Sequence, residues 1–329
     1  GDYDTDGDLD LLITGLSSSN SRISKIYRNN GDNTFTEQTR SILTGVSSSS
    51  ASWGDSDNDG DLDILIAGVA DEGIVTQIYV NQGDNLFIKS DVSVLPGISN
   101  GSAVWGDYNN DGLSDILLTG VGQTSSKISK VFRNTGNNVF SEMTSLNLES
   151  LALSSGAWCD YDNDGDLDIF ITGENSLSKY LFKIYRNDGN DTFKEMTGIY
   201  LEGVRSSSIS FADYDSDGDQ DLLVTGTTSI STLNGLTRIY RNEIPASNNK
   251  PNTITGLQSE WKNDSLIFRW NTSSDDKTPT SALKYNLRIG TSTGGNELRS
   301  AQALPDGNML LPKNNSIYSA ISIVFKVPF

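Results

Sequence analysis

The sequence predicts an all-β protein: five repeated units of four strands that form part of a β-propeller, followed by a β-sandwich. A nine-residue acidic motif recurs five times, at steps of 52 or 53 residues. Short apolar runs bounded by turn residues follow each copy, without the periodicity of a helix. Tandem units of this length are typical of solenoids, propellers and arrays, and four strands per unit favour a propeller blade.

The acidic motif places alternating aspartates around a sharp turn. In the copy at 160–168, positions 1, 3, 5 and 9 are Asp160, Asp162, Asp164 and Asp168, and position 6 is a glycine. The other copies occupy 2–10, 55–63, 107–115 and 213–221. Ca²⁺ accepts about six to eight oxygens at flexible angles, and the glycine permits a turn that a Cβ resists. The motif therefore predicts up to five calcium sites.

The segments between the motifs repeat in the same order. An apolar strand ending in glycine follows each loop, at 11–15, 64–68, 116–120, 169–173 and 222–226. A second strand follows, at 25–29, 77–81, 130–134, 183–187 and 238–242. Tight turns such as 30–33 and 188–191 lead to a third strand that begins with a phenylalanine, and a strand such as 51–55 enters the next loop. This count predicts eighteen strands, with three in the first and last units.

Large aromatic residues recur just before the acidic loops. Trp53, Trp105, Trp158 and Phe211 hold one position in successive copies. We expect them to pack between adjacent blades, because aromatics in register fill such interfaces; a ligand-stacking set is the alternative. The single cysteine, Cys159, is expected to be a small buried residue beside the fourth loop.

The composition excludes several function classes. The formal charge is −19, and the five loops hold 23 of the 43 acidic residues, so five Ca²⁺ would bring the charge to −9. Binding to a nucleic-acid backbone is not expected, because it requires clustered Lys and Arg. The chain has no histidine, which excludes a His-dependent hydrolase or a zinc enzyme, and one cysteine gives no zinc-type spacing.

No apolar run has the length of a membrane span. The chain opens inside a repeat, so we expect its start to be a truncation, and the lack of a signal peptide then says nothing about export.

The repeat pattern stops at Glu243, and a second domain is expected beyond it. Residues 244–251 form a Pro/Asn-rich linker, and 252–329 show alternating apolar and polar strands that predict a β-sandwich. Its expected core consists of Trp261, Phe268, Trp270 and Tyr285.

The repeats resemble the FG-GAP/VCBS family, bacterial relatives of the integrin α-subunit propeller. The resemblance covers about 1–243 and rests on the acidic loop with its following strand, the IYRN strand, and the turn leading to Phe. A closed propeller of five blades would need two more strands than the eighteen counted, and one of seven blades would need ten more; we expect the five repeats to be part of a seven-bladed propeller. The tail is similar to a fibronectin type III module through WNTSSDDKTP and LKYNLRIG; its end, SIYSAISIVFKVPF, departs from the pattern, so we expect the module to be cut short.

In the family, positions 1, 3, 5 and 9 of the loop give side-chain oxygens and position 7 gives its backbone carbonyl. The resemblance therefore implies these ligands: Asp2, Asp4, Asp6, Asp8 and Asp10; Asp55, Asp57, Asp59, Asp61 and Asp63; Asp107, Asn109, Asp111, Leu113 and Asp115; Asp160, Asp162, Asp164, Asp166 and Asp168; Asp213, Asp215, Asp217, Asp219 and Asp221. The third loop has only three charged ligands, so we expect it to bind most weakly.

We interpret the calcium as a structural staple; a sensor, or a metal that bridges to a ligand, is the alternative. Loops that vary on a rigid scaffold are the usual place for recognition, although they could simply be unconstrained. The connections that vary are 16–24, 69–77, 121–129, 174–182 and 227–237, and we expect them on the face opposite the calcium loops.

Two function classes remain. The first is a noncatalytic extracellular or cell-surface module that binds a protein or a glycan. The second is the accessory or catalytic propeller of a secreted polysaccharide lyase, which needs a base such as Lys, Arg or Tyr near a bound uronate. The sequence singles out no catalytic residue and favours the first class.

Overall fold

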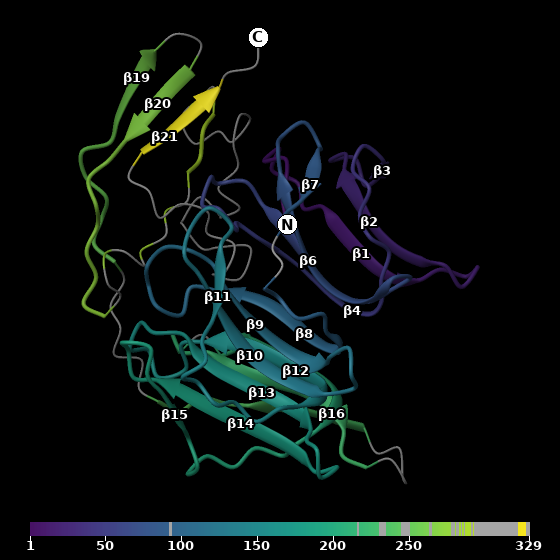
Figure 1. Ribbon diagram of the computed structural model, residues 1–329. Helices are drawn as coiled ribbons and strands as arrows, with labels where there is room; N and C mark the ends of the chain where they lie inside the picture. Colours follow the sequence, from purple (N-terminus) through teal and green to yellow (C-terminus); the bar gives the residue numbers. More distant parts are fainter. Residues whose placement is uncertain are drawn as a thin grey trace.

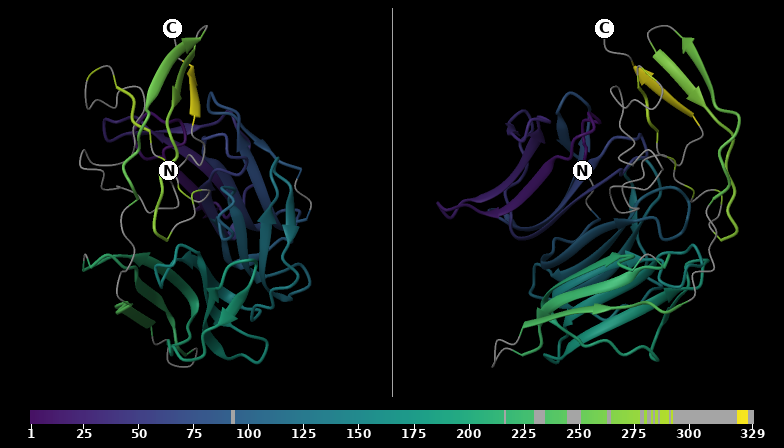
Figure 2. Two further views of the ribbon diagram at one scale, coloured as in Figure 1. Left: turned by 90° about the vertical axis from the view of Figure 1, so that its left-hand side faces the viewer. Right: turned by 180° about the vertical axis from the view of Figure 1, so that it is seen from behind.

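The computed structural model describes residues 1–91, 94–215, 217–229, 235–244, 251–262, 265–277, 280, 283, 285, 287–290, 292 and 322–326. Eighteen strands form five antiparallel sheets, the blades, which follow one another along an arc (Figures 1 and 2). Blades 2, 3 and 4 have four strands, and blades 1 and 5 have three. The predicted β-propeller and its strand count are confirmed; a total of seven blades stays a prediction.

The strands of each blade follow the chain in order. Blade 1 contains β1 (Leu11–Leu16), β2 (Arg22–Asn29) and β3 (Phe35–Gln38); blade 2 contains β4 (Ser47–Gly54), β5 (Asp63–Ala70), β6 (Gly73–Asn81) and β7 (Phe87–Lys89); blade 3 contains β8 (Ser99–Gly106), β9 (Asp115–Val121), β10 (Lys127–Asn134) and β11 (Phe140–Glu142); blade 4 contains β12 (Ala152–Cys159), β13 (Asp168–Glu174), β14 (Tyr180–Asn187) and β15 (Phe193–Glu195); blade 5 contains β16 (Arg205–Ala212), β17 (Asp221–Thr227) and β18 (Gly235–Tyr240).

Antiparallel pairing puts the acidic loops at one end of the blades. In blade 2 the loop at 55–63 joins β4 to β5, and the connection from β5 to β6 lies at the other end of the same sheet. The same pairing recurs in blades 3, 4 and 5, and in blade 1 the loop at 2–10 leads into β1. The variable connections therefore lie at the ends opposite the acidic loops.

Each strand shares its side chains between two neighbouring blades. Along β5, Ile64 and Ile66 pack into a cluster with residues of blade 1, whereas Leu65 packs into a cluster with residues of blade 3. Similar clusters join blades 3 and 4, and blades 4 and 5. The core of the propeller is thus a series of layers between blades, not one central core.

The recurring tryptophans lie in these layers. Trp105 and Trp158 are buried, and the ring of Trp53 stacks on Tyr3 of the preceding loop, with centroids 5.6 Å apart. Trp158 stacks in the same way on Tyr108, at 5.9 Å. The predicted role in blade-to-blade packing is confirmed.

A glycine at the end of the strand that enters the acidic loop (β4 or β8) makes room for the next tryptophan. A Cβ at Gly54 would lie 2.4 Å from Cδ1 of Trp105, and the same distance separates a Cβ at Gly106 from Trp158. Blade 4 has Cys159 at this position, and the facing residue of blade 5 is Phe211 instead of a tryptophan. The larger residue on one side is thus matched by a smaller ring on the other.

The strands that lead into the acidic loops carry a repeated β-bulge. The pairing of β4 with β5 shifts register between Ser47 and Ser50, and β8, β12 and β16 shift at the equivalent place. The bulged residues are left-handed, with φ between 46° and 51°: Ser48, Asn100, Leu153 and Ser206. A nearby serine hydroxyl then accepts a backbone N–H of the next blade, as Ser50 does from Ala103 at 3.1 Å.

The C-terminal region forms a separate antiparallel sheet of β19 (Gln258–Lys262), β20 (Ser265–Arg269) and β21 (Ser322–Lys326) (Figure 1). Trp270 and Tyr285 are buried together with Phe268 beside them, which is compatible with a β-sandwich core. The prediction that Trp261 belongs to this core is wrong: it is 61% exposed, because β19 is an edge strand with no described residue packed on it.

The fibronectin type III assignment and the domain boundaries stay predictions. Residues 245–250 of the linker, and the stretch from 316 to 321 near the C-terminus, lie outside the described residues.

Replacing Gly54 with alanine should destabilise the propeller. The added Cβ would collide with the buried ring of Trp105, and overpacking of this kind costs about 1–3 kcal/mol. Denaturant unfolding in calcium would measure the loss. Gly198→Ala is the matched control, because an added Cβ there meets nothing within 4 Å. Equal unfolding free energies for the two variants would contradict the packing role.

Candidate metal centres

The described residues of all five acidic loops share the same backbone hydrogen bonds. The first aspartate accepts a hydrogen bond from the N–H of the glycine at position 6, over 2.9–3.2 Å in every copy. These glycines have φ of 92–100°, where other residues are strained. The aspartate at position 5 accepts the N–H of position 7, so the chain curls around its own carboxylates.

The aspartate at position 9 joins the loop to the middle of its blade. In blade 2, Asp63 Oδ2 accepts the N–H of Ser56 and Oδ1 accepts the N–H of Asn81, at 2.8 and 2.7 Å. Asp10, Asp115, Asp168 and Asp221 make the same two bonds in their own blades. The carboxylate at position 9 therefore fixes the loop against the blade, in addition to the strand pairing.

An asparagine of the next blade holds each of the first four loops. Asn81 Nδ2 donates to the carbonyl of Tyr3 in the preceding loop, at 3.1 Å, and also to Leu62 of its own loop. Asn134, Asn187 and Asn242 bind the carbonyls of Ser56, Tyr108 and Tyr161 in the same way, at 2.6–2.7 Å. We call this contact the asparagine clasp. It connects the loop of one blade to the sheet of the next.

Four loops bring three carboxylates together. In each group, one oxygen from each residue lies within 4.8 Å of the others. The groups are Asp2, Asp4 and Asp6; Asp55, Asp57 and Asp63; Asp160, Asp162 and Asp168; Asp213, Asp215 and Asp221. Of the predicted ligands in these loops, positions 1 and 3 always belong to the group, and position 9 belongs to three of the four.

The aspartates at position 3 show that a cation fits. One carboxylate oxygen of Asp4, of Asp57 and of Asp162 is buried and has no hydrogen-bond donor within the described part of the chain. Leaving such an oxygen buried without a partner is costly. A hard cation such as Ca²⁺ would satisfy it, and carboxylate and carbonyl oxygens are the donors that Ca²⁺ prefers.

The third loop differs at this position. The Oδ1 atom of Asn109 accepts the N–H of Asp111 at 3.0 Å, so its Nδ2 atom occupies the buried place where the other loops present an oxygen. An amide nitrogen offers no lone pair to a metal. The residues of this loop therefore fit a cation less well than those of the other four.

Arginines lie beside several loops, which sequence reasoning missed. Arg241 contacts Asp215 and Asp217 at 2.9 and 2.8 Å, and Arg133 contacts Asp111 at 3.3 Å. Both are the arginine of the IYRN strand, and blade 2 has Val80 at that position. The recurrence of arginine before the clasp asparagine was the signal that could have revealed this pairing.

Burial raises the pKa of several loop carboxylates. It raises the pKa of Asp63 to about 7, and the pKa values of Asp115 and Asp168 to about 8, against the opposing effect of their hydrogen bonds. Burial followed by the charge of Asp63 raises the pKa of Asp55 to about 7. A bound cation would reverse this, because it favours the ionised form.

At the opposite ends of the blades, charged side chains gather from three blades. Glu174 of blade 4 pairs with Lys127 of blade 3 at 3.3 Å and with Arg205 of blade 5 at 2.7 Å. The Arg205 guanidinium lies 5.8 Å from the ring centroid of Tyr180. We call these four residues the polar cluster. Sequence analysis could not find this cluster, because its residues come from three different repeats.

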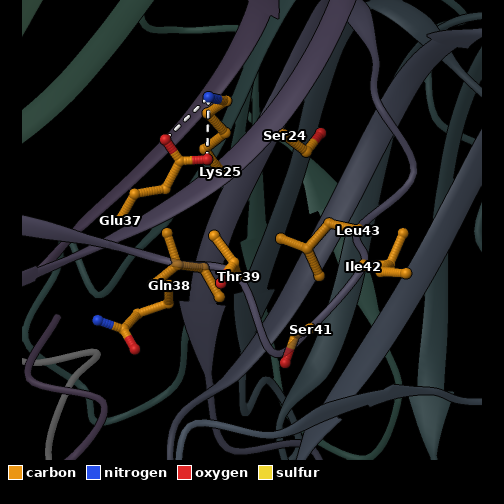
Figure 3. A pocket seen from close by; sticks show the side chains of 9 residues that line it. Ser24, Lys25, Glu37, Gln38, Thr39, Ser41, Ile42 and Leu43 are labelled. Carbon is orange, nitrogen blue, oxygen red and sulfur yellow. Dashed lines mark hydrogen bonds and ion pairs between the residues drawn. The ribbon is translucent and has the colours of Figure 1, made fainter.

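A hollow of about 220 Å³ lies in blade 1, between β2 and the segment that follows β3. Figure 3 shows Lys25 and Glu37 paired beside it, with their charged atoms 2.9 Å apart, and Leu43 on its other side. The two charges of this hollow thus satisfy each other.

The arc of sheets and the repeated acidic loops together define a β-propeller of acidic-loop repeats. The chain matches the FG-GAP-like repeat at residues 2–66, 107–171 and 160–224, which together cover more than half of it. The chain therefore belongs to the FG-GAP-like repeat family. Comparison with curated proteins gives no match.

Replacing Asn109 with aspartate should tighten calcium binding at the third loop. The new carboxylate could keep the bond to Asp111 and also turn an oxygen toward the metal, as Asp57 does. We expect at least about a tenfold gain in affinity, or ~1.4 kcal/mol, by calorimetry. Asn20→Asp, which adds the same charge at the opposite end of blade 1, is the control. No tightening in Asn109→Asp would refute this ranking of the sites.

Proposed function

We propose that the chain is a noncatalytic, calcium-stabilised binding or adhesion module. It acts outside the cell or at the cell surface and recognises a protein or a glycan through the blade ends opposite the acidic loops. One observation carries the proposal: the hydrogen-bonded acidic loops and the asparagine clasp recur at one end of the blades, and the opposite ends carry the connections that differ between blades. Within the described residues, no helix has the length and apolar character needed to cross a membrane.

Calcium in this proposal is a structural ion. Asp2, Asp4, Asp6 and their counterparts would hold it, and the ion would neutralise carboxylates that burial otherwise penalises. Each loop is bonded to its own blade, and four are also bonded to the next blade, so a stabilised loop stabilises the blade stack. A sensor role has less support, because the loop residues are already committed to these bonds.

Calcium should raise the melting temperature, and the effect should grow with pH. Each site contributes about 2.7 kcal/mol at a hundredfold excess over its dissociation constant. Free aspartate has a pKa of about 3.9. Between that pH and about 7–8, the folded metal-free chain holds protons that the unfolded chain has lost, so its stability falls as pH rises. Saturating calcium should remove this slope.

Thermal melts at pH 5 to 8, with calcium and after its removal, would measure both effects. An equal melting temperature with and without calcium at pH 8 would contradict the structural role of the ion.

The alternative function is a polysaccharide lyase or its accessory propeller. The polar cluster is the observation that supports the lyase alternative. Lys127, Arg205 and Tyr180 are groups that could bind a uronate or remove its proton. Against it, Glu174 pairs with both cations, and each of these bonds links neighbouring blades. A structural role in holding the blades explains these contacts without a substrate.

A glycan array, run beside an ultraviolet assay for unsaturated uronides, separates the two functions. Binding without product is the expected outcome. Lys127→Met serves as the test variant for the cluster and Lys194→Met, on the third strand of blade 4, as its control. Uronide formation that disappears in Lys127→Met, or on removal of calcium, would favour the lyase.

A further inference from the structure

The aspartate at position 7 of the acidic loop has a side chain that the metal site does not need. In the family this position gives its backbone carbonyl, yet four of the five loops carry a carboxylate there: Asp8, Asp61, Asp166 and Asp219. In the fourth loop the carboxylate has another partner, because Asp166 Oδ1 accepts a hydrogen bond from Nδ2 of Asn110 at 2.6 Å. Asn110 belongs to the third loop, so this bond joins the acidic loops of blades 3 and 4.

The same amide group also reaches the backbone of the fourth loop. Asn110 Nδ2 donates to the carbonyl of Gly165 at 3.3 Å. The N–H of Gly165 is in turn bonded to Asp160, the first aspartate of that loop, at 3.2 Å. Asn110 itself is position 4 of the third loop and lies in the sequence between two implied ligands, Asn109 and Asp111. The link therefore connects the backbone next to the ligands of one loop with the backbone next to the ligands of the next.

The backbone at position 4 is the same in the first four loops. It is left-handed, with φ between 57° and 62°, at Thr5, Asn58, Asn110 and Asn163. Asparagine adopts this conformation more readily than most residues. The side chain at position 4 thus leaves each of these loops in an equivalent direction.

The fourth and fifth loops contain the counterparts of the two linked groups. Asn163 is position 4 of the fourth loop and Asp219 is position 7 of the fifth, and they are only 6% and 2% exposed. Within the described part of the chain, Asn163 Nδ2 and Asp219 Oδ1 have no hydrogen-bond partner. A buried donor and a buried acceptor without partners are costly, and each of these groups offers what the other lacks.

We propose that the asparagine at position 4 is a positioning residue for the metal site of the next blade, and that Asn110 couples the sites of the third and fourth loops. The inference rests on the proposed role of calcium. Binding at the third loop fixes the backbone on both sides of Asn110, which holds the amide group in place against the fourth loop. The fourth loop then loses less freedom when it binds its own ion. The coupling acts equally in both directions, as linkage between two binding equilibria requires.

Hydrogen exchange of the whole chain, measured by mass spectrometry at a series of calcium concentrations, tests the proposal. It gives each loop its own midpoint, the calcium concentration at which half of its protection has developed. Asn110→Gly removes the link, and glycine accepts the left-handed backbone without strain. The midpoint of the fourth loop should rise about two- to tenfold, the effect of one net hydrogen bond, although no residue of that loop has changed.

Asn137→Gly is the matched control. Asn137 is an exposed asparagine with φ of 52° in the turn between β10 and β11 of the same blade, and its replacement should leave the midpoint of the fourth loop unchanged. Asn163→Gly repeats the test one blade further on, where the midpoint of the fifth loop should rise.

A second arm separates coupling from a purely structural role of Asn110. Asn109→Asp, which tightens the third loop, should also lower the midpoint of the fourth loop. In the double variant Asn109→Asp/Asn110→Gly, only the third loop should respond to the new carboxylate. A structural role alone would raise the midpoint of the fourth loop in Asn110→Gly but would not transmit this change.

The outcomes separate this inference from the proposed function. If calcium protects none of the loops, the structural role of calcium fails, and the coupling fails with it. If calcium protects the loops but Asn110→Gly leaves the midpoint of the fourth loop unchanged, the coupling alone is overturned. It is overturned too if the double variant still transmits the change to the fourth loop, or if Asn137→Gly shifts that midpoint as much as Asn110→Gly does.

Discussion

The buried bond from an asparagine side chain to the preceding acidic loop is the contact on which the rest of the structure depends. Asn134, for example, bonds through its side chain to the loop behind it, and its own backbone N–H bonds to Asp115. One residue therefore fixes three things: the position of its strand, the position of its own loop, and the distance between two blades. Because the groups are buried, losing any of these bonds would leave polar atoms without partners.

This arrangement makes the acidic loops part of the blade interface. The tyrosine at position 2 stacks on the next tryptophan while its carbonyl accepts the asparagine clasp, as Tyr108 shows. A cation in the loop would therefore stabilise more than the loop itself. The opposite ends of the blades are joined by contacts such as the pairs of Glu174, which do not recur in every blade.

Most of the fold could be predicted from the sequence, because the repeats report the same structure five times. The strand order, the eighteen strands, the packing of Trp105 and the turn at Gly60 all follow from residue type and period. Contacts between repeats could not be predicted, since spacing along the chain does not show which faces meet. The clasp of Asn81 on Tyr3, the amide orientation of Asn109 and the polar cluster are of this kind. Trp261 was misplaced because one aromatic residue, unlike a series in register, does not show which face of a strand is covered.

The pairing of Cys159 with Phe211 restricts how such a chain could have evolved. Where the loop-entering strand ends in Gly, as in β4 and β8, the next blade packs a Trp against it. Where that strand ends in Cys159, the next blade has the smaller ring of Phe211. Copies of the unit are therefore not interchangeable modules, even though their backbones match. Duplication or exchange of whole repeats would have to preserve the neighbour on each side, so blades 4 and 5 would have to be exchanged together.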